Sequence, residues 1–263
     1  MSERKRPVIA IDGPAGVGKS TLAKRLADAL DFVRLDTGAM YRALALKALE
    51  ADMDLDAGGA LGVLARNSEI TLEPMAHTTR VLLDGRDVTQ RIRDADVSQA
   101  ASRVSAHAPV REWMVSQQRL MGAGGGVVME GRDIGTKVFP DAEVKIFLEA
   151  NEQTRASRRW REEAAKTKEH YVTEVDENMP PEAEILRQLR ERDERDRGRA
   201  ASPLVAAEDA VVVDTTALDE DEVLAAVLKV IASRRPDLRV RRERGELLAQ
   251  AEPLGPLGPR GES

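Results

Sequence analysis

The sequence predicts an α/β fold: a parallel sheet of five strands with helices on both faces. Short apolar segments suited to buried strands alternate along the chain with longer segments whose apolar residues recur at helical spacing. Such alternation is typical of consecutive strand–helix units, which build a parallel sheet covered on both sides. A glycine-rich turn directly after the first strand also fits this architecture. The predicted strands are Val8–Ile11, Phe32–Leu35, Val127–Met129, Val144–Leu148 and Val211–Val213.

The helices between these strands are predicted from spacing and end signals. Leu22, Leu26 and Leu30 recur at intervals of four and form the inner stripe of the helix after the first strand. Pro109 stands at the first position of another helix, where its fixed φ and missing N–H are tolerated. The other helical segments are Met40–Leu49, Val110–Met121 and Glu220–Ala232.

One segment interrupts the alternation, and we expect it to form an inserted lobe at about residues 67–107. Ile70–Leu72 and Val81–Leu83 have strand character, Asp84-Gly85 is a turn signal, and Val97–Val104 is helical. The whole of residues 1–233 is expected to be a single domain. Residues 234–263, which end in a Pro/Gly-rich stretch, are predicted to be a flexible tail.

The composition excludes several classes of function. The chain of 263 residues has no cysteine, which excludes a disulfide framework, a thiolate metal site and thiol catalysis. Its net charge of −6 and aromatic content of 3% argue against a nucleic-acid partner, which would require positive charge and stacking side chains. No apolar run approaches the roughly 20 residues that span a bilayer. We therefore expect no membrane partner and a cytoplasmic location.

The segment from Gly13 to Thr21 reads Gly-Pro-Ala-Gly-Val-Gly-Lys-Ser-Thr and joins the first predicted strand to the first predicted helix. It matches a P-loop, in which backbone N–H groups and a helix N-terminus surround phosphates. Lys19 is expected to reach the β- and γ-phosphates, and the Ser20 hydroxyl to hold the Mg²⁺ that accompanies ATP. The sequence therefore predicts a nucleoside triphosphate site. Its expected residues are Gly13, Pro14, Ala15, Gly16, Val17, Gly18, Lys19, Ser20 and Thr21.

Two further loops that carry arginine follow predicted strands. Asp36-Thr37-Gly38-Ala39-Met40-Tyr41-Arg42 follows the second strand, and Gly131-Arg132-Asp133-Ile134-Gly135-Thr136 follows the third. Ligands of open α/β sheets bind at the carboxyl ends of strands, and the guanidinium group matches phosphate oxygens bidentately. These loops therefore favour a second, anionic substrate beside the P-loop. We interpret Asp36 itself as the cap of the following helix.

A fourth motif is the charged run Arg192-Asp193-Glu194-Arg195-Asp196-Arg197-Gly198-Arg199. In a helix, Arg192, Asp196 and Arg199 share one face. Taken alone, this face fits either a solvated set of ion pairs or a set of ligand contacts.

With these motifs in this order, the chain resembles the bacterial cytidylate kinases, which belong to the nucleoside monophosphate kinase group. The resemblance runs from about Val8 to Ala232 and rests on the four motifs above. It implies a P-loop NTPase that acts as a monomer and transfers the γ-phosphoryl group of Mg·ATP to CMP or dCMP, giving ADP and CDP or dCDP. It also implies that the inserted lobe binds the monophosphate and that a mobile lid, at about 155–182, closes over the phosphates. One departure is Glu130, where many members have Asp, and a role for this carboxylate near Mg²⁺ stays open.

The resemblance also implies roles for individual side chains. Arg42 and Arg132 would clamp the CMP phosphate. Ser102, Arg111 and Asp133 would read the cytosine ring, whose exocyclic amine requires an acceptor. The ribose, phosphate and base contacts would come from Arg192, Asp196 and Arg199. The implied catalytic residues are Lys19, Arg132 and Arg192.

Two other functions remain open from the sequence. A kinase for a different small acceptor, such as UMP or a sugar acid, would use the same arginine-bearing loops. The other is a nucleotide-dependent switch. The two arginine-bearing loops argue against it, because a switch has no second phosphate for them to bind. The chain also lacks the Asn/Thr-Lys-x-Asp element by which GTPases usually read guanine.

Overall fold

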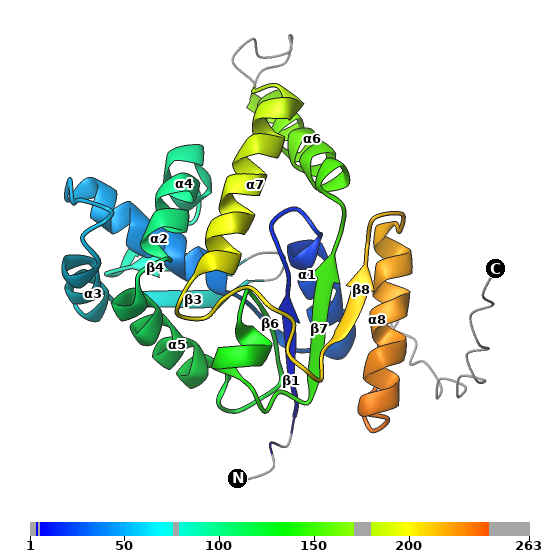
Figure 1. Ribbon diagram of the computed structural model, residues 1–263. Coiled ribbons are helices and arrows are strands. Elements are labelled where there is room, and N and C mark those ends of the chain that lie inside the picture. Colours follow the sequence, from blue (N-terminus) through cyan, green and yellow to red (C-terminus); the bar gives the residue numbers. More distant parts are fainter. Residues whose placement is uncertain (1–3, 5, 76–78, 171–179, 242–263) are drawn as a thin grey trace.

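The computed structural model describes residues 4, 6–75, 79–170 and 180–241, and within them the predicted α/β fold is confirmed (Figure 1). The central sheet has five parallel strands in the order β2-β6-β1-β7-β8. Hence β6, which is far along the chain, lies between β1 and β2. The bounds are β1 Val8–Asp12, β2 Val33–Asp36, β6 Val127–Glu130, β7 Val144–Glu149 and β8 Val211–Asp214.

Helices cover both faces of this sheet, as the alternation predicts. On one face, α1 (Lys19–Leu30) and α8 (Glu220–Arg234) pack on a cluster that includes Ile9 and Ile146. On the other face, α5 (Ala108–Gly122) and a short π-helix, η2 (Ile134–Val138), pack around Val8. The sequence did not predict η2, because five residues are too few to show a helical period.

A second core lies beside the sheet and includes the segment predicted as an inserted lobe. It contains a small antiparallel sheet, β3-β4-β5, a 3₁₀ turn, η1, and the helices packed on them. The sequence missed α3 and the two-residue strand β5, and it placed the start of α2 too late. That helix begins at Thr37 because the Asp36 carboxylate accepts the Ala39 N–H at 3.2 Å and caps it. The bounds are α2 Thr37–Glu50, α3 Gly58–Arg66, β3 Ile70–Pro74, β4 Thr79–Leu83, β5 Arg86–Asp87, η1 Arg91–Arg93 and α4 Ala95–Val104.

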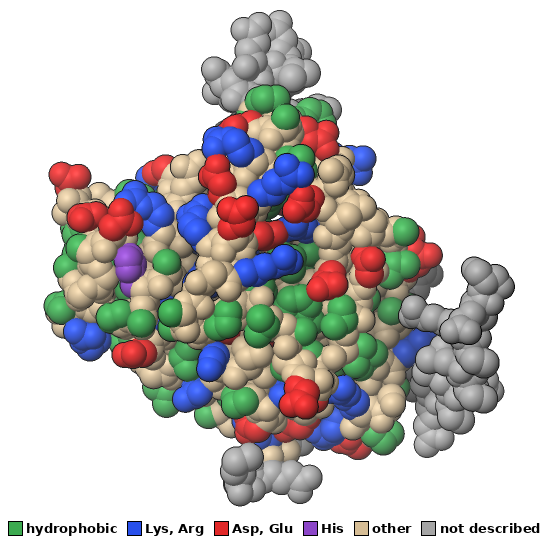
Figure 2. Space-filling model, in the orientation of Figure 1, with side chains coloured by type: hydrophobic (Ala, Val, Ile, Leu, Met, Phe, Trp, Pro, Cys, Tyr) green, Lys and Arg blue, Asp and Glu red, His purple; other side chains and the backbone are tan. Residues whose placement is uncertain are grey.

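Two charged helices, α6 (Glu152–His170) and α7 (Glu182–Gly198), stand side by side above the carboxyl end of the sheet (Figure 1). They pack through a small apolar cluster of Ala156, Ile185 and Leu189. Elsewhere their surfaces carry many acidic and basic side chains, which crowd the top of the face shown in Figure 2. Most of α6 falls in the predicted lid, 155–182, of which 171–179 lie outside the described residues.

The chain beyond α8 stays on the molecule for several residues. Leu238 and Val240 pack against the apolar cluster beneath α1 and α8, and the Arg241 N–H donates to the Ala29 carbonyl at 2.7 Å. The rest of the predicted tail, 242–263, lies outside the described residues. Within the described ranges, every helix is too short or too polar to cross a bilayer.

Candidate active site

The P-loop leaves β1 and enters α1 through backbone conformations that favour glycine. Gly13 has φ 146°, and a Cβ added there would lie 2.3 Å from the carbonyl oxygen of Leu148. Gly18, directly before α1, has φ 90°. Because the first N–H groups of α1 have no partners within the helix, the loop and the helix N-terminus together form an anion-binding cradle. This is the arrangement that the motif predicts.

Lys19 opens α1, and its side chain is buried in the cradle. Its Nζ donates to the carbonyl oxygen of Pro14, within the P-loop itself. Burial lowers the pKa of Lys19 well below its ordinary value, and the positive charges of Arg132 and Arg192 lower it further. The cationic side chains of Lys19, Arg132 and Arg192, from three different segments, therefore lie close enough to repel one another. A bound phosphate chain would supply the negative charge that this cluster lacks.

Ser20 and Glu130 form the part of the site that fits a metal ion. The Ser20 hydroxyl donates to Glu130 Oε2 at 2.7 Å, and Arg34 holds Oε1 of the same carboxylate at 2.7 and 3.1 Å. A serine hydroxyl beside a buried carboxylate is the oxygen-rich donor set that Mg²⁺ prefers. The described residues contain no cluster of three metal-ligating side chains. Ser20 and Glu130 therefore fit a Mg²⁺ site in which the remaining ligands come from a nucleotide.

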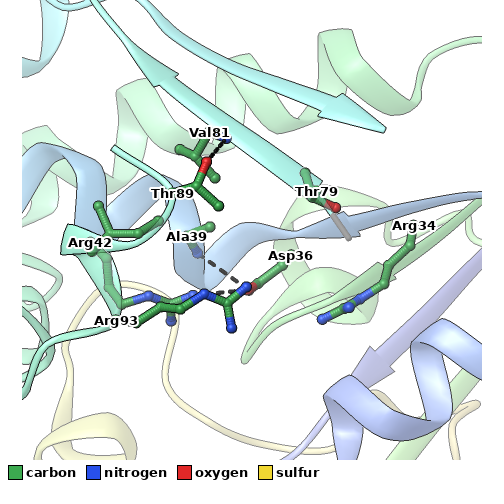
Figure 3. Close-up of a pocket in the computed structure, with 9 residues that line it drawn as sticks. Arg34, Asp36, Ala39, Arg42, Thr79, Val81, Thr89 and Arg93 are labelled. Atoms are coloured by element: carbon green, nitrogen blue, oxygen red, sulfur yellow. Dashed lines mark hydrogen bonds and ion pairs between the residues drawn. The ribbon is translucent and has the colours of Figure 1, made fainter. Parts of the chain in front are cut away.

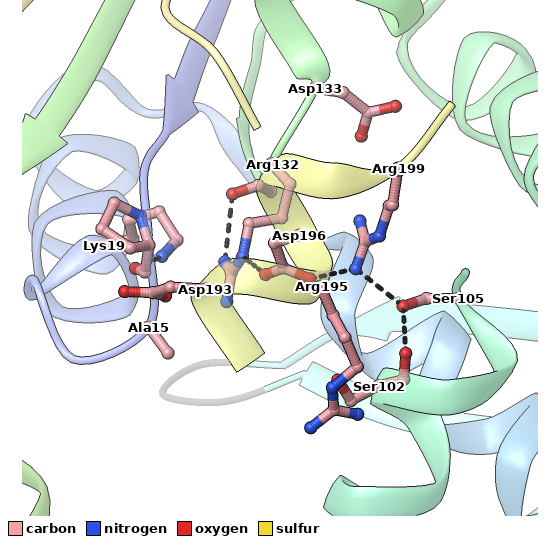
Figure 4. A network of polar contacts seen from close by, with 12 residues as sticks. Ala15, Lys19, Ser102, Ser105, Arg132, Asp133, Asp193, Arg195, Asp196 and Arg199 are labelled. Atoms are coloured by element: carbon pink, nitrogen blue, oxygen red, sulfur yellow. Dashed lines mark hydrogen bonds and ion pairs between the residues drawn. The ribbon is translucent and has the colours of Figure 1, made fainter. Parts of the chain in front are cut away.

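Arg132 and the predicted face of α7 meet in one network (Figure 4). Asp196, which is 1% exposed, accepts from Arg132 Nε at 2.8 Å and also pairs with Arg199. Arg199 in turn donates to the Ser105 hydroxyl at 2.9 Å. The ion-pair interpretation of this face is therefore correct in part. The pairs are buried against the Arg132 loop rather than solvated.

Three residues predicted to read a base lie together at the end of this network. Arg111 on α5 pairs with Asp133 at 2.5 Å, and both side chains are at most 5% exposed. The Arg111 guanidinium also lies 5.5 Å from the centre of the Tyr41 ring. The buried hydroxyls of Ser102 and Tyr41 have no hydrogen-bond partner among the described residues. Unpaired buried hydroxyls are costly, so this corner is suited to a polar ligand that pairs with them.

The remaining predicted arginines, Arg42 and Arg192, lie close enough for their charges to interact. Arg42 on α2 pairs with Asp36 at 2.8 Å (Figure 3). Arg192 on α7 is buried, which lowers its pKa to about 10, and the charges of Arg132 and Arg42 act in the same direction. Its Nε has no partner among the described residues. The charges of Lys19, Arg132 and Arg192 thus interact with one another, and Arg42 joins them through Arg192. That these side chains hold phosphates stays a prediction.

Sequence reasoning missed one pair that joins the α6–α7 helices to the P-loop. Arg155 on α6 pairs with Asp193 on α7 at 2.5 Å, and both side chains are less than 10% exposed. Arg155 also donates to the carbonyl oxygen of Ala15, in the P-loop, at 3.3 Å. The sequence signal was an acidic residue next to Arg192, in a run where every residue from Arg190 to Arg197 is charged. Such a run does not reveal which carboxylate is buried.

Asp12, the last residue of β1, has a structural role. Its two carboxylate oxygens accept the N–H groups of Ile134 and Gly135, both at 2.8 Å. Burial raises the pKa of Asp12 to about 6, although these two hydrogen bonds oppose the shift. Asp12 therefore fixes η2, and with it the loop that carries Arg132 and Asp133, to the strand that leads into the P-loop.

Comparisons with known proteins agree with this geometry. The chain matches the cytidylate kinase family over residues 9–233. It is 46% identical to the cytidylate kinase of Geobacillus kaustophilus over 232 residues, which cover 88% of this chain and 99% of that protein. The cytidylate kinase of Enterococcus faecalis is 48% identical over 227 residues, covering 86% and 96%. That of Aeromonas hydrophila is 46% identical over 222 residues, covering 84% and 92%. The family match over residues 9–233, together with this identity over nearly the whole length of each relative, shows that the chain belongs to the cytidylate kinase family.

Proposed function

We propose that the protein transfers the γ-phosphoryl group of Mg·ATP to CMP or dCMP, giving ADP and CDP or dCDP. The observation that carries the proposal is the buried pair of Arg111 and Asp133, together with the unpartnered hydroxyl of Ser102. Each of these groups has a polarity that cytosine can satisfy. The amine at N4 needs an acceptor, and O2 and N3 need donors.

The same corner supports discrimination against uracil. Uracil carries a carbonyl oxygen where cytosine carries the N4 amine, so an acceptor of the protein would face an acceptor of the base. A buried polar site that is left unpaired rejects the wrong substrate strongly. We therefore expect the preference for CMP over UMP to depend on Ser102 and Asp133.

The chemistry requires positioning and charge neutralisation rather than covalent catalysis by the protein. The P-loop N–H groups and Lys19 would hold the ATP phosphates, while Arg42 and Arg132 hold the acceptor phosphate in line. Arg192, which has an unpaired buried Nε, would donate to the transferred group as charge spreads over its oxygens. When bound, Mg²⁺ would neutralise the oxygens of the β- and γ-phosphates, held by Ser20 with Glu130 behind it.

We propose that the segment from about residue 155 to 182, to which most of α6 belongs, acts as the lid. Its base is tied to the P-loop through Arg155, which contacts both Asp193 and the Ala15 carbonyl. Binding of phosphates in the P-loop would therefore act directly on Arg155, at the base of α6. A closed lid would exclude water, which competes with the acceptor for the phosphoryl group. We further propose that the protein works as a monomer in the cytoplasm, and its lack of cysteine suits that reducing compartment.

The test is ADP release from Mg·ATP with CMP, dCMP, UMP, AMP and GMP offered separately. We expect strong stimulation by CMP and dCMP alone. The Ser102→Ala variant should lose most of the preference for CMP over UMP, whereas Ser98→Ala, on the same helix, should retain it. Stimulation of the wild type by another monophosphate would keep the kinase and reject the cytosine assignment. No stimulation by any monophosphate would favour the nucleotide-dependent switch.

A further inference from the structure

A hollow of about 330 Å³, counted with the space open to solvent, lies between the start of α2 and the small antiparallel sheet (Figure 3). Arginines from three separate elements reach it: Arg34 from β2, Arg42 from α2, and Arg93 from the end of η1. Figure 3 shows Arg42 and Arg93 extending from one side toward Asp36, with Arg34 on the other side. Thr79 and Thr89 add hydroxyl groups to the lining.

The positive charge of this hollow is only partly neutralised. Arg42 pairs with Asp36 at 2.8 Å, and Arg34 pairs with the buried Glu130 at 2.7 Å. Arg93 makes no ion pair with any residue in the described part of the chain. One cationic group is therefore left without a counter-charge beside two others. A partly enclosed space with such an excess attracts anions.

The position of Arg93 is fixed by its neighbours rather than by a free loop. Ile92, directly before it, is 2% exposed in the core that the lobe shares with α2. The Ile92 N–H donates to the Val88 carbonyl at 3.0 Å, which anchors the turn. The other arginine of η1, Arg91, pairs instead with Asp94 and Asp96, and it does not line the hollow.

Arg42 joins this hollow to the phosphate cradle. It lines the hollow on one side, and on the other its charge acts on Arg192, within the network that includes Arg132. An anion held by Arg42 would therefore sit at the boundary between the two spaces. The oxygen of this anion that points away from the phosphate cradle would then face Arg93.

We propose that Arg93 is a further substrate-binding residue, which donates to the phosphate of the acceptor nucleoside monophosphate together with Arg42. The inference rests on the proposed function, because it assumes that the acceptor is a phosphate monoester. Such a group carries close to two negative charges at neutral pH, so it supplies a counter-charge to Arg42 and Arg93 at once. The inserted lobe would then grip the acceptor by its phosphate, which every nucleoside monophosphate has, while α4 and α5 grip the base.

The experiment compares Arg93→Ala with Arg91→Ala, a matched control in the same turn. We would measure the dissociation constant of CMP by titration calorimetry, the inhibition constant of cytidine against CMP, and the KM of ATP. Loss of Arg93 is expected to weaken CMP binding by about tenfold or more, the typical effect of removing one charge-assisted contact. Cytidine, which has no phosphate, should inhibit both variants and the wild type equally. Arg93→Lys should recover part of the CMP affinity, and Arg91→Ala should change none of these constants.

Two results would overturn the inference. CMP affinity in Arg93→Ala equal to that of the wild type would remove Arg93 from the site. An equal loss for cytidine and CMP would show that Arg93 acts on the nucleoside or on the fold of the lobe. Whether the wild type binds CMP tests the proposed function, independently of the comparison between variants. If it prefers another monophosphate, the same comparison is made with that monophosphate and its nucleoside. If it binds none, the inference falls together with the kinase assignment.

Discussion

Replacing Asp196 by asparagine tests the electrostatics of the acceptor network directly. Burial alone would raise the pKa of this carboxyl, but Arg132, Arg199 and Arg192 outweigh it and lower the pKa to about 2. The ionised carboxylate is therefore stabilised by folding. Asp196→Asn keeps the shape of the side chain and removes this charge from among the arginines. We predict a less stable protein at neutral pH.

The magnitude follows from the size of the shift. A change from 3.8 to about 2 is roughly two pKa units, or about 2 kcal/mol in the free energy of unfolding. Because the folded pKa lies below the unfolded one, this stabilisation is complete above about pH 4 and is lost as the pH falls through about 2. Burial lowers the pKa of Arg199, but its guanidinium stays protonated at neutral pH. The arginines therefore remain charged in the variant, without their shared counter-ion.

The assay is urea unfolding of both proteins at pH 7, 5, 4 and 3. We expect a difference of about 2 kcal/mol in the free energy of unfolding at pH 7 and 5, and a smaller difference at pH 3. Glu194→Gln, which removes an exposed carboxylate from the same helix, serves as the control and should change little. Equal stability of wild type and Asp196→Asn at pH 7, or a difference that grows as the pH falls, would refute the reasoning.

Three further predictions concern the two halves of the site. Lys19→Ala should reduce kcat by about a hundredfold or more. It should not lower the urea midpoint, because burial and the neighbouring cations disfavour the Lys19 charge in the folded protein. Arg132→Ala should raise the KM of CMP by at least about tenfold without changing the dissociation constant of ATP; equal losses would remove Arg132 from the acceptor side. Asp12 has a folded pKa of about 6, above its ordinary 3.8, so folding takes up a proton between these values. Its contribution to the free energy of unfolding should therefore rise as the pH falls from 7 to 4, a slope that Asp12→Asn should lack in urea titrations.

The sheet, the P-loop and the longer helices could be predicted because their signals are local. Buried strands such as Val8–Asp12 are continuous apolar runs, and the spacing of Gly13, Gly18 and Lys19 is contained within one loop. The predictions failed where a structure is too short to show a period, as in β5 and η2. The Asp36 cap was predicted correctly, but the apolar spacing alone placed the start of α2 at Met40, three residues too late.

In the candidate site, too, local signals could be predicted from the sequence and long-range contacts could not. The residues that approach the phosphates could be named, because each stands in a motif at the end of a strand. Their partners could not. Arg132 and Asp196 are 64 positions apart, and Arg155 and Asp193 are 38 apart, so only the packing of α7 decides which charges meet. Asp12 shows the same limit, since the N–H groups that donate to its carboxylate, those of Ile134 and Gly135, are more than 120 positions away.

The order of the central strands sets the spacing of two motif loops. β1 and β6 are hydrogen-bonded neighbours, with Ile11 opposite Glu130, so the P-loop and the Arg132 loop leave strands that are about 4.8 Å apart. Backbone pairing, and not the side chains of either loop, therefore fixes where the two loops begin. A substitution in the lobe, whose strands form a separate sheet, would leave this spacing unchanged.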